Sequence, residues 1–334
     1  TAILFGTACM GAVKYVPENM KVELSLKVPG NNAVNYKLHP DKLENSYFDY
    51  EWRSDNKLPI TVFHKVEERD SCMRLTVQLT AAQDVYFNYR QLLSTGYRHD
   101  NCQFYMPGFW YRRNLRSPKK APSFHTSDSW LVREDRLSAP LTGIFSEKEK
   151  RFMTVNRLDD FSMDALATHK EGEIILSGKT SLGFTGFENQ QGIAMLSFGF
   201  PYREAPKSYI RKLTLAPEVE AFQLMKKGES VLLTWEIMES GADDFSDFIQ
   251  HTWEHCYDTY APKPVENSYS IADMKQVLSC FFVNSLVDNQ PLVYNSGIHL
   301  KVSDCERNGQ AEVGFIGRVL LNAFNAWEYG TGKN

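Results

Sequence analysis

Hydrophobic and polar residues alternate along many short segments before residue 240. In residues 20–28, Val22, Leu24 and Leu26 alternate with lysine, glutamate and serine. A period of two predicts a strand with one buried face. The pattern predicts further strands at residues 48–53, 60–67, 73–79, 83–92, 141–145, 152–156, 173–177, 193–200, 209–215 and 230–238. Because turn residues separate these strands at short intervals, we expect a mainly β protein built on a large antiparallel β-sandwich.

The segment at residues 230–238, SVLLTWEIM, differs from the other strands. Both of its faces carry apolar residues, with Leu233, Trp235 and Ile237 on one and Leu232 and Met238 on the other. A strand of this kind is typical of the centre of a sheet that is covered on both sides. We therefore expect another element to cover the second face.

Beyond residue 240 the apolar spacing becomes helical. Asp243 and Asp244 are suited to cap a helix that the prolines at 262 and 264 end. The apolar residues along one side of this helix are Phe245, Phe248, Trp253 and Tyr257. A second helix is predicted at residues 270–288, with Ser270 and Asp273 as its start signals, then a short extended piece at 297–304 and a third helix at 311–329.

The last predicted helix is apolar around more of its circumference than a surface helix tolerates. It must be buried on two sides, so it leans on the sandwich or belongs to a larger helical array. We expect a β-sandwich domain at residues 1–240, a linker helix at 241–267 and an α-helical region at 268–334.

An irregular, aromatic stretch at residues 105–140 interrupts the strands. We interpret it as a long ordered surface loop, and loops of this length are usually functional. It combines flat rings with arginines, a pairing that suits carbohydrate: sugar rings stack on aromatics, and hydroxyl or acidic groups accept hydrogen bonds from rigid donors. The candidate substrate-binding residues are Trp110, Tyr111, Arg112, Asn114, Arg116, Trp130 and Arg136. The alternative is that the rings plug one end of a core and the arginines are solvated.

The segment at residues 112–120 holds five basic residues in nine. A solvated loop is one interpretation. The other is an anionic ligand such as a uronate or a sulfated sugar, clamped by Arg112 and Arg116. If the stretch binds sugar, replacing Trp110 by alanine is expected to weaken glycan binding without unfolding the domain. If the rings are a plug, stability falls instead.

Composition narrows the remaining classes. The chain has 334 residues, of which 43% are hydrophobic and 13% aromatic, and a net charge of −4, which argues against general nucleic-acid binding. The sequence contains no run of eighteen apolar residues, so it predicts no membrane-spanning helix. The start lacks a signal-peptide pattern. We expect a periplasmic or secreted protein from which a signal peptide was removed, and a cytoplasmic location stays open.

Short chemical motifs contribute little. Six scattered cysteines form neither a disulfide framework nor a CxxC metal site. The string from His251 to His255 matches the HxxEH pattern of inverted zinc peptidases, but it lies in the predicted linker, and we expect no metal or cofactor. No pair of carboxylates is marked for glycosidic catalysis: Glu134 and Asp135 adjoin arginines, and the aspartates near residue 160 are typical of turns.

The order of parts resembles that of a known class. The motifs are MPGFWYRRN (106–114), SWLVREDRLSAP (129–140), SVLLTWEIM leading into DDFSDFIQHTWEHCYDTYAPKP, and GFIGRVLLNAFNAWEYG (314–330). They resemble glycoside hydrolase-like proteins of gut Bacteroidetes, in which a galactose-mutarotase-like β-supersandwich precedes an (α/α) toroid. The resemblance implies that residues 268–334 are the first hairpin of a toroid. It also implies a cleft between sandwich and toroid, with Trp110, Tyr111, Asn114 and Arg136 on the sandwich wall.

In this class the catalytic acid usually comes from the toroid, so the resemblance transfers no catalytic residue to this chain. Our first hypothesis is a portion of a polysaccharide-degrading glycoside hydrolase that binds an oligosaccharide or polysaccharide, acidic or neutral, through the aromatic and arginine loop. A non-catalytic carbohydrate-binding module is the second. The third is a polysaccharide lyase, in which arginine neutralises a uronate and tyrosine or histidine removes the proton.

Overall fold

The computed structural model describes residues 16–69, 72–118, 120–159, 164–165, 167, 170–211, 214–264, 266, 269–284, 286–287, 290–294, 324 and 327–328. The chain forms two compact units, Thr1–Tyr260 and Ala261–Asn334. Each is described by itself.

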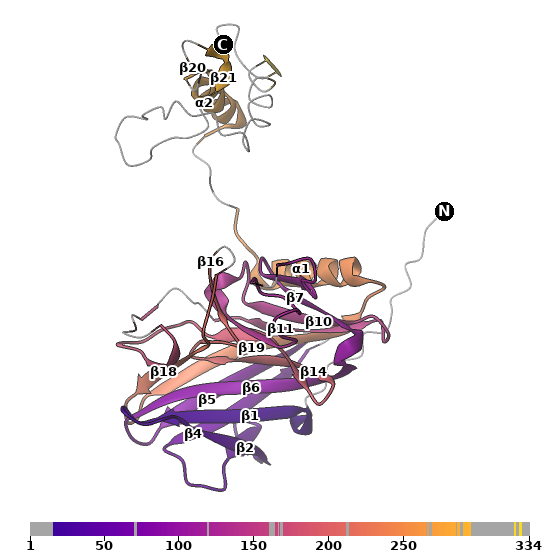
Figure 1. Cartoon of the computed structure of the whole chain (residues 1–334). Helices are drawn as coiled ribbons and strands as arrows, with labels where there is room; N and C mark the ends of the chain where they lie inside the picture. The colour runs from indigo at the N-terminus through magenta and orange to yellow at the C-terminus, as the bar shows by residue number, and fades with distance from the viewer. Residues whose placement is uncertain are drawn as a thin grey trace. The chain divides into compact units, whose positions relative to one another are not determined.

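The first unit is a two-layer β-sandwich (Figure 1). One layer has the order β2–β1–β6–β14–β13–β9, and each pair in it is antiparallel. Its strands are β1 (Met20–Lys27), β2 (Val34–Lys42), β6 (Val85–Arg98), β9 (Trp130–Arg133), β13 (Phe184–Gln190) and β14 (Ile193–Phe200).

The second layer has the order β3–β4–β5–β19–β11–β10–β7–β8, again antiparallel. Its strands are β3 (Tyr50–Arg53), β4 (Ile60–Glu68), β5 (Cys72–Ala81), β7 (Cys102–Met106), β8 (Trp110–Arg112), β10 (Leu141–Ser146), β11 (Arg151–Arg157) and β19 (Ser230–Gly241). Strand β2 joins the layers, because its first half pairs with β1 and its second half with β3. The expected mainly β sandwich is thus confirmed.

Smaller strands lie beside the sandwich. They are β12 (Gly172–Ile175), β15 (Arg203–Glu204), β16 (Ser208–Arg211), β17 (Thr214–Ala216) and β18 (Val219–Met225). The β12–β18 pair is parallel. The single strand expected at residues 209–215 is instead the antiparallel pair of β16 and β17. The stretch at 105–140, expected to be an irregular loop, contains regular structure: the strands β8 and β9 and a 3₁₀ turn, Glu134–Arg136.

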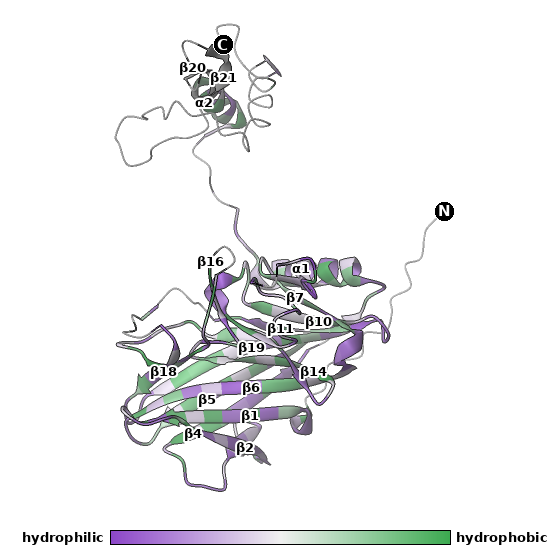
Figure 2. Ribbon diagram, viewed as in Figure 1, coloured by the Kyte–Doolittle hydropathy of each residue, from purple (hydrophilic) through white to green (hydrophobic). Residues whose placement is uncertain are grey.

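Alternation of hydrophobic and polar residues places the main core between the layers, as the bands of colour along strands such as β6 indicate (Figure 2). Leu24 and Phe198 from one layer and Leu75 and Trp235 from the other are buried in this core. The rings of Phe198 and Trp235 lie 5.2 Å apart, centroid to centroid. Burial of such large rings contributes most of the stability of a sandwich of this size.

The outer face of the second layer carries helix α1 (Phe245–Tyr260), which Figure 1 shows running beside β7, β10 and β11. Phe248 of α1 is fully buried, and its ring lies 4.9 Å from that of Phe152 and 5.9 Å from that of Phe145. Gly143 makes this approach possible, because a Cβ there would lie 2.5 Å from the Phe248 ring. A second element therefore does cover part of the outer face.

Two details of this face differ from expectation. Met238 packs under α1, but Leu232 at the other end of β19 is 60% exposed. The buried residues of α1 are Phe245, Phe248, Thr252 and Cys256, whereas Trp253 and Tyr257 are exposed. The expected cap is present: the Asp244 carboxylate accepts the backbone N–H groups of Asp247 and Ser246, which lower its pKa.

The second unit is described only in part. Helix α2 (Ile271–Asn284) begins at the expected capping pair, in which Asp273 N–H donates to the Ser270 hydroxyl over 3.1 Å. A hairpin of β20 (Leu286–Val287) and β21 (Gln290–Tyr294) follows. The extended piece expected at 297–304 lies outside the described residues, as does the helix expected at 311–329 apart from the helical Phe324, Trp327 and Glu328. Among the described helices, none combines the length and apolar character needed to cross a bilayer.

Candidate functional site

The polypeptide folds into a tight double turn on either side of β8. Gly108 has φ of +78°, and the backbone N–H of Phe109 donates to the Met106 carbonyl over 3.0 Å, which reverses the chain after β7. Arg112 and Asn114 also have positive φ, +58° and +48°. Side chains are strained in this region of φ, and asparagine tolerates it best. The second turn therefore depends on what Asn114 contributes.

The Asn114 amide holds the second turn together. Its Oδ1 accepts the Tyr111 backbone N–H over 3.1 Å, and its Nδ2 donates to the carbonyls of Phe109 and Pro122, each over 3.2 Å. Both N–H bonds of the amide are thus occupied within the loop. The sequence predicts that Asn114 forms hydrogen bonds with a sugar. In the structure its amide forms hydrogen bonds with the backbone of the loop instead.

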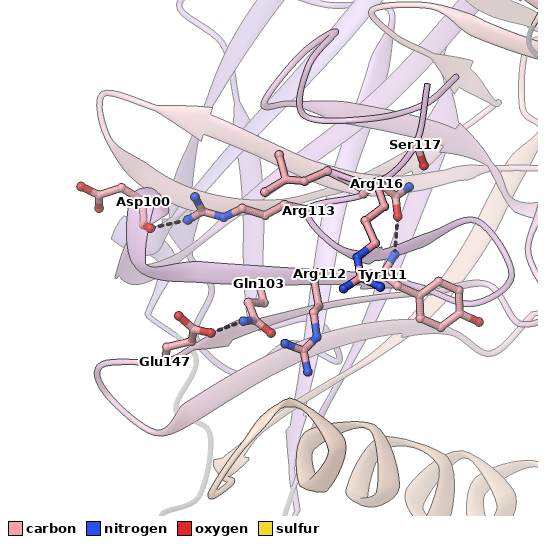
Figure 3. A pocket seen from close by; sticks show the side chains of 10 residues that line it. Asp100, Gln103, Tyr111, Arg112, Arg113, Arg116, Ser117 and Glu147 are labelled. Atoms are coloured by element: carbon pink, nitrogen blue, oxygen red, sulfur yellow. Dashed lines mark hydrogen bonds between the residues drawn. The ribbon is translucent and has the colours of Figure 1, made fainter. Parts of the chain in front are cut away.

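The turn borders an open pocket with a volume of about 890 Å³, which we call the arginine pocket. This lies within the range of roughly 300–1,000 Å³ typical of small-ligand sites. Its lining residues are Asp100, Gln103, Tyr111, Arg112, Arg113, Asn114, Leu115, Arg116, Ser117 and Glu147. Figure 3 shows the guanidinium groups of Arg112 and Arg116 between the Tyr111 ring on one side and Gln103 with Glu147 on the other.

The three arginines of the pocket have different surroundings. Arg113 is part of the framework: its Nε donates to the Cys102 carbonyl over 3.1 Å, and its guanidinium lies over the Phe124 ring. Arg112 lies 5.1 Å from the centroid of the Phe245 ring. Within the described residues, neither Arg112 nor Arg116 forms an ion pair with a carboxylate, unlike the Arg98–Asp100 pair at the pocket edge.

The pocket also carries acidic and aromatic groups. Arg98 holds the pKa of Asp100 below its usual value through a hydrogen bond, so this carboxylate is ionised at neutral pH. Glu147 accepts a hydrogen bond from the Gln103 amide. The Tyr111 ring is 52% exposed, and its hydroxyl accepts the Gly108 backbone N–H over 3.3 Å. An exposed ring beside two arginines that have no carboxylate partner in the described part of the chain can stack on a flat ligand and hold an anionic group.

The two tryptophans proposed for sugar stacking are in the interior. Trp110 and Trp130 are both 0% exposed, and their rings lie 5.7 Å apart. Each indole N–H donates to a backbone carbonyl, that of Arg112 and that of Ser127 respectively. They offer no surface to a ligand in this structure, so the plug interpretation describes these two rings correctly. The physical reason is that β8 and β9 place them against Phe187 and Phe109.

Arg136 lies away from the arginine pocket. Its Nε is 2.5 Å from Glu204 Oε1, and its Nη2 donates to Oε2 of the same carboxylate over 3.2 Å. It lines a smaller depression of about 270 Å³ together with Arg133 and Tyr202. Of the residues expected to bind substrate, the pocket therefore brings together Tyr111, Arg112, Asn114 and Arg116.

Several pocket residues were not expected from the sequence. Gln103 comes from β7 and Glu147 from the turn after β10, and the antiparallel register that pairs Gln103 with Phe145 brings them together. Asp100 lies in the 3₁₀ turn His99–Asn101. The only sequence signal was that Asp100 and Gln103 directly precede the aromatic stretch; Glu147 had none.

The HxxEH string does not form one site. His251 lies 3.4 Å from Asp247, whereas Nε2 of His255 lies 2.8 Å from Oε1 of Glu236 on β19. Burial alone would raise the pKa of Glu236, but the hydrogen bonds from His255 and Thr259 lower it to about 2. Cys72 completes this group from β5. The two histidines of the motif therefore have different partners.

A scan against models of known protein families finds no match, and a search among curated proteins finds no relative. Solved structures with a similar arrangement include a polysaccharide lyase, at 12% identity over 70% of this chain and 27% of the lyase, with a TM-score of 0.33. A galactose mutarotase-related enzyme from Lactobacillus acidophilus matches at 11% identity over 66% of this chain and 79% of the enzyme, with a TM-score of 0.33. The α-galactosidase AgaB from Geobacillus stearothermophilus matches at 10% identity over 66% and 30%, with a TM-score of 0.29.

The chain spans about a quarter of the length of the lyase and under a third of the α-galactosidase. The structures it resembles thus include carbohydrate-processing enzymes. Identities of at most 12% with TM-scores of at most 0.33 are too low to carry an activity over to this chain. Its function has to be argued from its own site.

Proposed function

We propose that the first unit binds an acidic oligosaccharide in the arginine pocket, as part of a polysaccharide-degrading enzyme. The observation that carries the proposal is the pair Arg112 and Arg116, which line an open pocket of about 890 Å³ and have no carboxylate partner among the described residues. A guanidinium fork matches the planar oxygen pair of a uronate and the oxygens of a sulfate ester.

Tyr111 supports a sugar over a simple anion. Its ring is 52% exposed beside Arg112, so a pyranose can place its C–H face on the ring while its acidic group meets a guanidinium. The pocket volume leaves room for more than one sugar unit. The role expected for Trp110 and Trp130 in stacking passes to this single ring, because those two side chains are buried.

The binding test is a calorimetric titration of the full chain with three oligosaccharides of one length: a polyuronate, a sulfated glycan and a neutral glycan. We expect the neutral sugar to bind at least tenfold more weakly, a difference of about 1.4 kcal/mol. The affinity for the acidic sugars should fall as salt rises, because the contacts are charged and exposed. Equal affinity for all three would contradict the proposal.

Arg112→Ala and Arg116→Ala are the matched variants. Arg53→Ala is the control, since this exposed arginine already pairs with Glu51 and Asp41 and does not line the pocket. Weakened acidic-glycan binding in the first two variants and unchanged binding in the control is expected. Binding that survives both pocket substitutions would move the site elsewhere.

A second candidate, lyase chemistry, is favoured by the contact between Gly108 N–H and the Tyr111 hydroxyl oxygen over 3.3 Å. This contact fixes the position of the Tyr111 hydroxyl, and Tyr111 would remove the proton beside a uronate carboxylate as the glycosidic oxygen on the neighbouring carbon leaves. The nearby arginines would neutralise that carboxylate.

Product analysis separates the alternatives. A lyase releases new chain ends with an ultraviolet-absorbing double bond, and a hydrolase releases reducing ends without it. A non-catalytic module binds and releases neither. Our proposal for residues 268–334 is that they begin an (α/α) toroid that supplies a catalytic acid, so a longer chain that contains the whole toroid is the second sample in this assay.

A further inference from the structure

A second cluster of reactive side chains lies on the outer face of the second layer, under helix α1. It consists of Cys72 from β5, Glu236 from β19 and His255 from α1, and one donor atom from each lies within 4.8 Å of the others. The β5–β19 register pairs Cys72 with Met238 and Arg74 with Glu236, so Cys72 and Glu236 are diagonal neighbours on one face. Helix α1 brings His255 to them.

The three donors are held in place by their surroundings. The Glu236 side chain is only 4% exposed; its Oε1 contacts His255 Nε2 over 2.8 Å and accepts the Thr259 hydroxyl over 3.1 Å. Its Oε2 meets Arg74 Nη2 over 3.4 Å. Cys72 is buried at 4% exposure. A carboxylate ligand whose second oxygen is held by a neighbour is typical of built metal sites.

An open depression of about 430 Å³ leads to the cluster. It is lined by all three donors and by Arg69, Arg74, Asp258 and Thr259. An ion can therefore reach the three donors from solvent. The two arginines oppose a cation, whereas Glu236, Asp258 and the thiolate that Cys72 forms on binding favour it.

Hydrogen bonds to Glu236 from His255 and from the Cys72 thiol account for these contacts when no ion is present. One thiolate, one imidazole and one carboxylate form a donor set that suits zinc. The donors come from three elements, two strands of the sheet and helix α1, so an ion joining them would fasten α1 to the sheet.

We propose that Cys72, Glu236 and His255 bind a divalent zinc-like cation that fastens helix α1 to the sandwich. On binding, the Cys72 thiol releases its proton to solvent and its sulfur bonds to the metal. The hydrogen on His255 moves to Nδ1, which leaves the Nε2 lone pair for the metal. Glu236 Oε1 exchanges its contact with His255 for the metal bond, and Arg74 keeps Oε2.

The test uses the full chain, freed of any purification tag and stripped with a chelator. Titration with zinc chloride is followed by calorimetry, and titration with cobalt(II) by the absorption that thiolate-to-cobalt charge transfer produces. We expect one cation per chain, a cobalt spectrum with a thiolate band, and a melting temperature raised by zinc because the ion binds only the folded chain.

Three variants remove one donor each: Cys72→Ser, Glu236→Gln and His255→Gln. Each should weaken zinc binding at least tenfold. His251→Ala is the matched control, because His251 lies one turn earlier on α1 and faces Asp247. Cys280→Ser controls for the exposed thiol of the second unit. Both controls should bind as the parent chain does.

Circular dichroism identifies any variant that fails to fold, and the cobalt spectrum of the parent chain needs no variant. The proposal is overturned by a parent chain that binds no cobalt, by a cobalt spectrum without a thiolate band, or by binding that persists in folded Cys72→Ser. Loss of binding in His251→Ala would assign the metal to the HxxEH helix motif instead.

Discussion

The aromatic side chains of residues 105–140 lie in two different surroundings, the buried core and the solvent-exposed arginine pocket. Trp110 and Tyr111 are neighbours in β8, yet the first is 0% and the second 52% exposed. Trp110 contacts other rings and gives its N–H to the backbone. Tyr111 and Arg112 face solvent. Trp110 and Tyr111 point to opposite sides because adjacent residues of a strand alternate, whereas Arg112, with φ of +58°, departs from that alternation. One short strand thus separates a core residue from a candidate ligand residue.

Replacing Trp110 by alanine is the strongest way to break this comparison. It removes a fully buried indole from a cluster with Trp130 and Phe187, and large-to-small changes of this kind lower the free energy of unfolding by about 3–5 kcal/mol. Chemical denaturation measures the loss. Tyr111→Ala, its neighbour, should change the same quantity by about 0.5 kcal/mol or less.

If Trp110→Ala kept its stability and lost glycan binding, the ring would have to reach the pocket in a conformation other than this one. If Tyr111→Ala destabilised the sandwich as strongly as Trp110→Ala, the contrast between the two faces of β8 would fail.

The interior also contains a titratable group whose surroundings contrast with those of the solvent-facing arginines. His64 on β4 is fully buried, with Nε2 2.7 Å from the Tyr89 hydroxyl, and burial lowers its pKa to about 3. In the unfolded chain the pKa is about 6.5. Between these two pKa values the unfolded chain binds a proton at His64 that the folded chain does not. The free energy of unfolding is therefore not reduced by His64 above about pH 6.5, and it falls as the pH drops from 6.5 toward 3.

The expected loss is about 1.4 kcal/mol for each pH unit below 6.5, or roughly 2–3 kcal/mol at pH 4.5. Urea denaturation across this pH range measures it. His64→Gln should flatten the slope, and His39→Gln, which changes an exposed histidine, should leave it as it is. Parallel slopes for the parent chain and His64→Gln would contradict the prediction.

The packing of helix α1 determines whether part of the outer face of the second layer is buried as tightly as the main core. A Cβ at Gly143 would lie 2.5 Å from the Phe248 ring and 3.1 Å from Thr154 Cγ2. Gly143→Ala should therefore lower the free energy of unfolding by about 1–3 kcal/mol through overpacking. Gly178→Ala is the matched control, because the nearest atom to its Cβ would be 4.0 Å away. Equal melting temperatures for the two variants would mean that α1 does not pack here as described.

Alternation identified most of the long strands of the sandwich, because their inner faces are apolar and their outer faces polar. It missed strands where burial does not alternate. In β13, Phe184 to Phe187 are buried in succession, and in β2 only Leu38 is buried. A three-residue strand such as β8 is too short for a period to show which of its rings faces inward. That is why the two tryptophans were predicted on the wrong side.

The candidate site was predictable where the chain itself brings residues together. Tyr111, Arg112 and Arg116 lie within six positions, and one turn is enough to place them on the pocket. Glu147 reaches it only through the pairing of β7 with β10, and the joining of Cys72, Glu236 and His255 requires both a strand register and the docking of a helix. Such contacts depend on pairing between distant segments, which a local pattern does not contain.

The smallest expected effect is the one that sharpens the comparison most. Arg112→Lys and Arg116→Lys keep the charge of the pocket but remove the planar fork. If the ligand carboxylate is held by two parallel N–H bonds, each lysine variant should lose about 1 kcal/mol of binding free energy, roughly fivefold in affinity, while each alanine variant should lose about 1–2 kcal/mol.

Stability should stay within about 0.5 kcal/mol of the parent chain in all four, because these side chains make no ion pair in the described structure. Calorimetric titration with an acidic oligosaccharide distinguishes the cases: lysine variants that bind as tightly as the parent would mean that the pocket attracts anions by charge alone and does not recognise their shape.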